Sequence, residues 1–218
     1  MCKLKLAVLG LLAIGYCNAF ADVLTDDFSA NNYGWNECAY ESNNGTAVID
    51  KGVLTVTSKG ENKAMGALLT ALSGVKTQVG QNTFFETHCY APIDPRKDFK
   101  VTCNVQIDKL ASDRLVGLVF NYRDGGNFYC FTFNDDQVRF ERHVDGEVVG
   151  AISQGVKWSK NKKTQQQWIL TSEGEELAFS VDGMELLRVK YMPLQFAGVG
   201  FYTFGKQKLI VSEMEYQQ

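Results

Sequence analysis

Phe99-Lys-Val-Thr-Cys-Asn-Val-Gln-Ile107 is the clearest strand pattern in the chain, because its side chains alternate strictly in character. Its odd-numbered positions are apolar and its even-numbered positions are polar or charged. Successive side chains of a β-strand point to opposite faces, so a period of two predicts a strand with one buried face. We therefore expect residues 99–107 to form a strand that covers a hydrophobic core.

The same pattern continues on both sides of this strand. Turn dipeptides that tolerate the positive φ angles of tight hairpins separate the segments, namely Lys51-Gly52, Asp145-Gly146, Asp182-Gly183 and the longer Asp124-Gly125-Gly126. We expect further strands at 46–50, 53–58, 115–122, 128–134, 137–144, 147–153, 167–172, 176–181, 185–190, 197–204 and 207–216. So many short strands at hairpin spacing predict an all-β fold in which two antiparallel sheets pack as a β-sandwich or jelly roll.

The composition suits one soluble globular domain. Of the 218 residues, 45% are hydrophobic and 22% charged, and the 14 Phe, 9 Tyr and 3 Trp favour strands. A net charge of −3 lacks the basic footprint that phosphate contacts require, so we expect no nucleic-acid partner. Beyond the N-terminus no apolar run approaches the roughly 20 residues of a membrane helix, so we expect no membrane insertion. We also expect a monomer.

The N-terminus has the three parts of a secretory signal peptide, at residues 1–21. Lys3 and Lys5 provide a basic start, an apolar run follows, and Ala19-Phe-Ala21 supplies the small residues of a cleavage site. This predicts a secreted or periplasmic protein with one domain over 22–218. Lipoprotein anchoring at Cys17 is disfavoured, because a bulky tyrosine precedes it where such sites need a small residue.

Removal of the signal peptide leaves four cysteines, which in an oxidising compartment allow three disulfide pairings. Cys103 lies on the core side of its strand. Cys130 is expected on the opposite side of a strand two steps away, beyond the reach of a disulfide. Cys38 and Cys89 both lie outside the expected strands. We therefore expect a Cys38–Cys89 disulfide and free thiols at Cys103 and Cys130.

Several short segments carry the pattern of one fold family: Asp27-Phe28 with Gly34-Trp35, then 51–56, 116–124 with 127–129, 179–183 and 197–201. Together they resemble the concanavalin A-like jelly rolls of lectins and glucanases, in particular LamG-like and keto-disaccharide-hydrolase-like domains. The resemblance covers most of the chain after residue 21. It implies the architecture and a frequent association with carbohydrate, and it carries over no catalytic residue. Residues 60–98 are expected to form an insertion or loop region, where binding loops tend to lie.

The three central strands allow a prediction of their pairing. With 123–127 as a loop and Asp135-Asp136 as a turn, Tyr122 opposes Phe128, Phe120 opposes Cys130, Cys130 opposes Glu141 and Phe128 opposes His143. One face then carries the core set Gly117, Val119, Phe131, Phe133, Val138 and Phe140. The opposite face mixes rings with polar groups, and its members are Leu118, Phe120, Tyr122, Phe128, Cys130, Thr132, Arg139, Glu141 and His143.

Rings beside charged groups suit a sugar-binding platform, because rings pack on the C–H side of a pyranose while Arg and Glu address its hydroxyls. The candidate ligand-binding residues are Tyr122, Phe128, Arg139, Glu141 and His143, joined from a later strand by Tyr202. The partner would be a glycan or polysaccharide. The alternative is an ordinary solvated sheet face with cross-strand charge pairs.

The sequence offers little support for catalysis. The Glu-x-Asp-x-Glu motif of glucanases with the resembling fold is absent, and Glu213-x-Glu215 is better explained as a solvated strand face. We expect no cofactor, although oxygen atoms from loops could hold a structural calcium. The sequence thus favours an exported, non-catalytic, carbohydrate-binding jelly roll. A hydrolase of the keto-disaccharide-hydrolase-like type and a structural or protein-interaction LamG-like domain are the alternatives.

Overall fold

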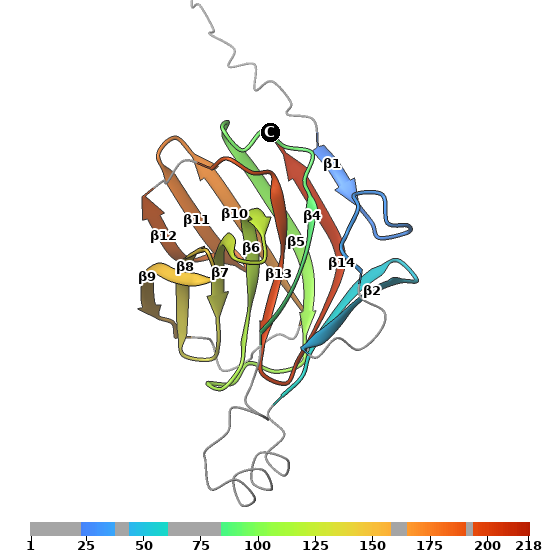
Figure 1. Cartoon of the computed structure of the whole chain (residues 1–218), viewed down its shortest axis with the longest axis horizontal. Coiled ribbons are helices and arrows are strands. Elements are labelled where there is room, and N and C mark those ends of the chain that lie inside the picture. Colours follow the sequence, from blue (N-terminus) through green and yellow to red (C-terminus); the bar gives the residue numbers. More distant parts are fainter. Residues whose placement is uncertain (1–22, 38–43, 61–83, 158–164, 191–193) are drawn as a thin grey trace, which may run out of the picture.

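The computed structural model describes residues 23–37, 44–60, 84–157, 165–190 and 194–218 (Figure 1). Nowhere in these ranges is there a helix long and apolar enough to cross a membrane. The regular elements of these ranges are β1 (Val23–Asp26), β2 (Gly45–Asp50), β3 (Val53–Ser58), β4 (Phe84–Tyr90), β5 (Phe99–Ile107), β6 (Leu115–Asp124), β7 (Asn127–Phe133), β8 (Gln137–Val144), β9 (Glu147–Gly155), β10 (Gln165–Glu173), β11 (Glu176–Val181), β12 (Met184–Lys190), β13 (Gly198–Phe204) and β14 (Gln207–Gln217).

The strands form two antiparallel sheets that lie face to face (Figure 1). The eight-stranded sheet has the order β12-β11-β10-β5-β14-β3-β2, and β1 pairs with the last residues of β14. The six-stranded sheet has the order β4-β13-β6-β7-β8-β9. The predicted all-β fold, a two-sheet antiparallel sandwich, is thereby confirmed.

Large aromatic side chains from both sheets fill the space between them. Phe131 of β7 stacks on Phe179 of β11 with ring centroids 5.5 Å apart, and Phe133 meets Trp168 of β10 edge-on at 5.1 Å. The alternation along β5 is as predicted, since its odd-numbered residues from Phe99 to Ile107 are all buried. Burial of this continuous apolar layer is the main stabilising contribution of the sandwich.

Three predicted hairpin turns have the backbone geometry that their dipeptides favour. The φ angles are 51° and 74° at Lys51-Gly52, 50° and 83° at Asp145-Gly146, and 50° and 77° at Asp182-Gly183. Two successive positive φ angles match the right-handed twist of the flanking strands, which is why these turns join hairpins.

The predicted pairing of β6 with β7 is wrong, because β6 contains a bulge that a simple alternation does not show. Phe120 opposes Tyr129 and Val119 opposes Cys130, and the register shifts between Phe120 and Asp124. Leu118 and Phe120 therefore belong to the core, whereas Val119 and Gly117 lie on the other face with Tyr122. The predicted pairing of β7 with β8 is confirmed: Phe128 opposes His143, Cys130 opposes Glu141 and Thr132 opposes Arg139.

The end of the expected 60–98 insertion is regular structure. Residues 84–90 form β4, the edge strand of the six-stranded sheet next to β13, and residues 61–83 lie outside the described part of the chain. Cys89 therefore lies in a strand and points into the core, with its Sγ 3.4 Å from the hydroxyl of Tyr216.

Cys89 carries a free thiol in the structure, and its predicted partner Cys38 lies outside the described residues, so the Cys38–Cys89 disulfide is not seen. Cys103 and Cys130 are free thiols, as predicted. The prediction placed their strands two steps apart in one sheet, but these strands, β5 and β7, belong to different sheets. Cys103 is part of the core, whereas Cys130 lies on the far side of the six-stranded sheet.

Candidate functional site

The six-stranded sheet carries a second cluster of buried side chains on the face that points away from the core, here called the outer face. This cluster is separate from the core and consists of Val119, Tyr122, Phe128, Cys130 and Tyr202. Its aromatic members are almost closed to solvent, since Tyr122 is 5%, Phe128 2% and Tyr202 7% exposed. The outer face is therefore a packed layer of its own.

A row of four stacked rings crosses the outer face from β4 to β8. The ring centroids of His88 and Tyr122 are 3.8 Å apart, those of Tyr122 and Phe128 6.1 Å, and those of Phe128 and His143 4.3 Å. Neighbouring planes are inclined by 23°, 25° and 15°. We call these four residues the ring row. It has one of the two histidines of the chain at each end.

Two glycines of β13 make the ring row possible. β13 lies between β4 and β6, so a side chain of β4 can meet one of β6 only across the outer side of β13. Gly198 pairs with Tyr122 and Gly200 with His88, so no side chain stands between the two rings. A Cβ atom at Gly200 would collide with the carbonyl oxygen of Thr87, so this position requires glycine.

Each end of the ring row has a carboxylate two residues before the histidine. At the β4 end, Oε2 of Glu86 lies 3.3 Å from Nδ1 of His88, and the Tyr122 hydroxyl donates a hydrogen bond to Oε1 of Glu86 at 3.1 Å. At the β8 end, Oε2 of Glu141 lies 3.3 Å from Nε2 of His143. The two ends thus repeat the same Glu-x-His arrangement on different strands.

Arg139 is a charged group beside the β8 end that is more exposed than Glu141 and His143. Its guanidinium lies 4.0 Å from Oε1 of Glu141, and its Nε donates a hydrogen bond to Oε1 of Gln137 at 2.9 Å. The Arg139 side chain is 38% exposed, whereas the side chains of Glu141 and His143 are 17% and 14% exposed. The Arg139 guanidinium is therefore open to a solute at this face.

Burial keeps the hydroxyl and thiol groups of the outer face protonated. It raises the pKa of Tyr122, an effect to which the nearby Glu86 carboxylate adds. It likewise raises the pKa of Tyr202, with smaller contributions from Cys130 and Glu141. The pKa of the Cys130 thiol lies well above its usual 9.0, first because of burial and then because of Glu141. At neutral pH these groups are hydrogen-bond donors.

The ring row changes the expected mode of sugar contact. The rings of Tyr122 and Phe128 are stacked on neighbours on both sides, so their faces are already occupied. Tyr90 is different: it follows the Glu86 and His88 positions on β4, is 61% exposed, and meets His88 edge-on at 6.1 Å. Among the described aromatic residues near the ring row, Tyr90 offers an open face for stacking on a pyranose.

A depression opens at the other end of the ring row, where β7 and β8 approach the segment that leads into β13. It encloses about 240 Å³ and its polar lining includes Arg123, Asn127 and Arg142 beside Phe128 and His143. Amide and guanidinium groups of this kind are suited to the hydroxyls of a bound sugar. This depression places two of the predicted ligand-binding residues next to accessible space.

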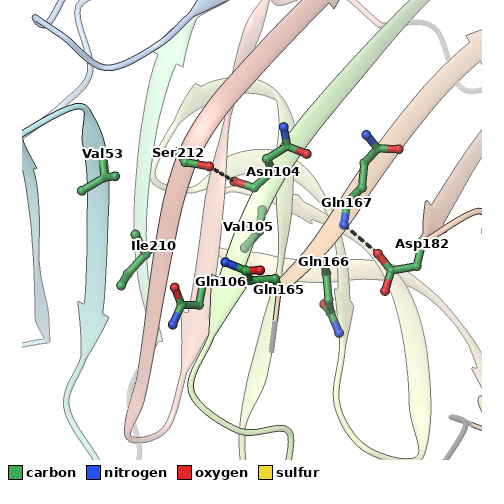
Figure 2. Close-up of a pocket in the computed structure, with 10 residues that line it drawn as sticks. All are labelled: Val53, Asn104, Val105, Gln106, Gln165, Gln166, Gln167, Asp182, Ile210 and Ser212. Atoms are coloured by element: carbon green, nitrogen blue, oxygen red, sulfur yellow. Dashed lines mark hydrogen bonds between the residues drawn. The ribbon is translucent and has the colours of Figure 1, made fainter. Parts of the chain in front are cut away.

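A second polar groove lies on the eight-stranded sheet (Figure 2). It encloses about 450 Å³ and is lined by Val53, Asn104, Val105, Gln106, Gln165, Gln166, Gln167, Asp182, Ile210 and Ser212. Its amides come from β5 and β10, and the backbone N–H of Gln167 donates to Asp182 at 2.9 Å. The described lining residues of the groove include no aromatic ring, so they offer no stacking surface for sugar.

All six candidate ligand-binding residues lie together on or beside the outer face: Tyr122, Phe128, Arg139, Glu141, His143 and Tyr202. Sequence reasoning missed Glu86, His88 and Tyr90. The signal was present, because 84–90 alternates in the manner of a strand and contains the same Glu-x-His spacing as Glu141 and His143. Glu213 lies on the other sheet, where it accepts a hydrogen bond from Asn104 at 3.3 Å.

Comparison with known proteins identifies the fold. No protein-family model and no curated protein matches this chain. Solved structures do match: the carbohydrate binding module CBM66 from Bacillus subtilis has 16% identity and a TM-score of 0.50, with 82% of this chain and 96% of the module covered. A beta-glucanase from Bacillus licheniformis has 10% identity and a TM-score of 0.55, with 90% and 98% covered. The carbohydrate recognition domain of Emp47p has 12% identity and a TM-score of 0.55, with 94% and 99% covered.

Proposed function

We propose that this chain, which has the concanavalin A-like jelly-roll fold, is an exported monomer that binds glycan through the outer face of its six-stranded sheet. The observation that carries the proposal is the ring row. It brings two Glu-x-His pairs onto one face, between the exposed ring of Tyr90 and the depression at Phe128 and His143. The similarity in fold to a carbohydrate binding module and a carbohydrate recognition domain supports the same ligand class.

The side chains of this face fit an uncharged sugar. Tyr90 supplies an apolar ring, Arg139 supplies donors, and Glu86 and Glu141 supply acceptors. Because these side chains are held by hydrogen bonds and stacking, little conformational entropy is lost when a ligand binds. The amide groove of Figure 2 is a weaker candidate, since none of its described lining residues carries a ring.

Spacing favours binding over hydrolysis. The two carboxylates of the ring row lie on β4 and β8, which are four strand steps apart in the sheet. At about 4.8 Å a step, the two strands are about 19 Å apart along the sheet. The carboxyl pair of a glycosidase is separated by about 5 to 9.5 Å, because both groups act on one glycosidic bond. Turnover of a glycoside panel that is lost in Glu141→Gln or His143→Ala would instead support the hydrolase alternative.

A glycan array with the mature protein, screened with and without calcium, tests the proposal. We expect Tyr90→Ala to weaken binding by about 2- to 10-fold through loss of ring stacking. Arg139→Ala should weaken it by about 10-fold or more through loss of charge-assisted hydrogen bonds. Tyr90 is exposed and Arg139 is partly exposed, so the fold should survive.

Gln167→Ala, in the groove on the other sheet, is the matched control and should bind glycan normally. If Gln167→Ala abolishes binding while Tyr90→Ala and Arg139→Ala do not, the site is the groove. The export part of the proposal has its own measurement, since cleavage after Ala21 makes Asp22 the N-terminal residue of the exported protein.

A further inference from the structure

Three potential metal ligands of different chemistry converge at the β8 end of the ring row. Cys130 of β7 lies directly opposite Glu141 of β8, and His143 follows two residues later on the same side. The Sγ of Cys130, a carboxylate oxygen of Glu141 and a ring nitrogen of His143 all lie within 4.8 Å of one another. In the described part of the chain this is the one such group.

The distances between these ligand atoms are close to those around a bound metal ion. Zinc binds Cys sulfur at about 2.3 Å, and His nitrogen and Glu oxygen at about 2.0 to 2.2 Å, so neighbouring ligands in a tetrahedron are about 3.5 Å apart. Nε2 of His143 and Oε2 of Glu141 are already 3.3 Å apart. The stacking of His143 on Phe128 at 4.3 Å holds the imidazole in place. Small side-chain rotations would complete the arrangement.

Thr132 lies next to this group on β7 but does not belong to it. Thr132 is the next residue of β7 on the outer face, is completely buried, and its hydroxyl meets no hydrogen-bond partner in the described structure. A buried hydroxyl without a partner is costly. Thr132 faces Arg139, on the other side of the Cys130–Glu141 pair from His143, and so adds no ligand to the group.

We propose that Cys130, Glu141 and His143 form a site for a zinc-class divalent metal ion with an open fourth position on the outer face. A thiolate, an imidazole and a carboxylate are the donors that such ions accept, and three protein ligands leave room for water or a sugar hydroxyl. Binding displaces the thiol proton of Cys130. Arg139 lies on Oε1 of Glu141, so the metal would use Oε2, which faces His143.

The chain contains matched controls for each ligand. The Glu86–His88 pair has the same spacing and the same 3.3 Å contact, but the residue opposite Glu86 on β13 is Tyr202 rather than cysteine. Cys103 is equally buried and free, but it lies in the core between the sheets. A genuine site should depend on Cys130 and His143 and be indifferent to Cys103 and His88.

The test uses the metal alone, so it is independent of glycan binding. Under reducing conditions, calorimetric titration of the mature protein with Zn²⁺ should show one equivalent bound. Co²⁺ should give the thiolate-to-cobalt charge-transfer absorption that requires a sulfur ligand. Cys130→Ser should abolish that absorption and weaken Zn²⁺ binding by at least about 10-fold. Even the loss of a residue that only hydrogen-bonds a metal ligand lowers metal affinity by about 10- to 100-fold.

His143→Gln and Glu141→Gln provide a second route, should Cys130→Ser not fold. Each should weaken Zn²⁺ binding by at least about 10-fold. Cys103→Ser and His88→Gln should bind both ions as the parent does. Absence of stoichiometric Zn²⁺ binding, or its loss in Cys103→Ser and persistence in Cys130→Ser and His143→Gln, would overturn the proposal.

Discussion

Thr132 gives a direct prediction at the scale of one residue. Its hydroxyl is fully buried and meets no partner in the described structure. Replacement by valine removes the unsatisfied oxygen and keeps nearly the same shape. We expect Thr132→Val to raise the free energy of unfolding of the metal-free protein by about 1 kcal/mol, because an unpaired buried polar group costs about 1–3 kcal/mol. Urea denaturation in the presence of a chelator measures the change.

Thr87 is the matched control for this prediction. It is equally buried, but its hydroxyl donates a hydrogen bond to the carbonyl of Asn36 at 2.9 Å. Thr87→Val should therefore lower the free energy of unfolding by about 1 kcal/mol. If both variants lose stability, the Thr132 hydroxyl has a partner within the protein.

Asn121 shows how a single residue decides which side chains reach the outer face. Its φ angle is 49°, and its side-chain oxygen accepts hydrogen bonds from the backbone of Gln195 and Phe196 at 2.8 and 3.0 Å. Asparagine tolerates this left-handed conformation better than most residues. The resulting bulge turns Phe120 inward and Tyr122 outward. Apolar alternation alone did not reveal it, because the residues on both sides of the bulge are apolar or aromatic.

At the scale of elements, β13 is the strand on which the site depends. Its two outward glycines let β4 and β6 meet across it, although β4 lies more than 20 residues before β6 in the chain. β13 also contributes to the core, where its Phe201 stacks on Trp35 with ring centroids 5.7 Å apart. β13 thus supports both faces of the sheet.

We expect Gly200→Ala to lower the free energy of unfolding by more than about 2 kcal/mol, in the range of overpacked sites. The added methyl would collide with the backbone of Thr87 and force β4 away from β13. Gly150→Ala on β9 is the control, since nothing lies within 4 Å of its Cβ position. It should change stability by no more than about 0.5 kcal/mol. Equal effects of the two substitutions in guanidinium denaturation would contradict this account.

At the scale of the whole molecule, the buried thiols predict a loss of stability at high pH. Burial raises the pKa of Cys89 from 9.0 to about 12 and also raises that of Cys103 and Cys130. Below pH 9 each thiol is protonated in both the folded and the unfolded chain, so it does not change the free energy of unfolding with pH. Above pH 9 the unfolded chain releases protons that the folded protein keeps. Each thiol should then lower the free energy of unfolding by about 1.4 kcal/mol per pH unit.

Denaturation curves between pH 8 and pH 11, in reducing buffer with a chelator, measure this slope. Cys103→Ala should be less stable at every pH because it leaves a small cavity, but its slope should be shallower by one thiol. The quantity to compare is the slope of the free energy of unfolding against pH, not the absolute stability. A slope that is unchanged in Cys103→Ala would mean that its thiol already ionises in the folded protein.

The local features of this fold could be predicted from the order of the amino acids alone. The alternation of β5, the turns at Asp145-Gly146 and Asp182-Gly183, and the pairing of β7 with β8 were all predictable, because each depends on side-chain direction and turn geometry within one or two hairpins. This was enough for the all-β sandwich and for most of the outer face.

Which distant strands are neighbours became known only from the folded chain. It placed β4 beside β13, so that His88 and Tyr90 joined the site, and it put Cys103 and Cys130 on different sheets. It also separated Glu86 from Glu141 and brought Cys130, Glu141 and His143 together. The physical reason is that strand order depends on the packing of the entire apolar surface between the two sheets, whereas a sequence pattern records only which side of its own strand each residue occupies.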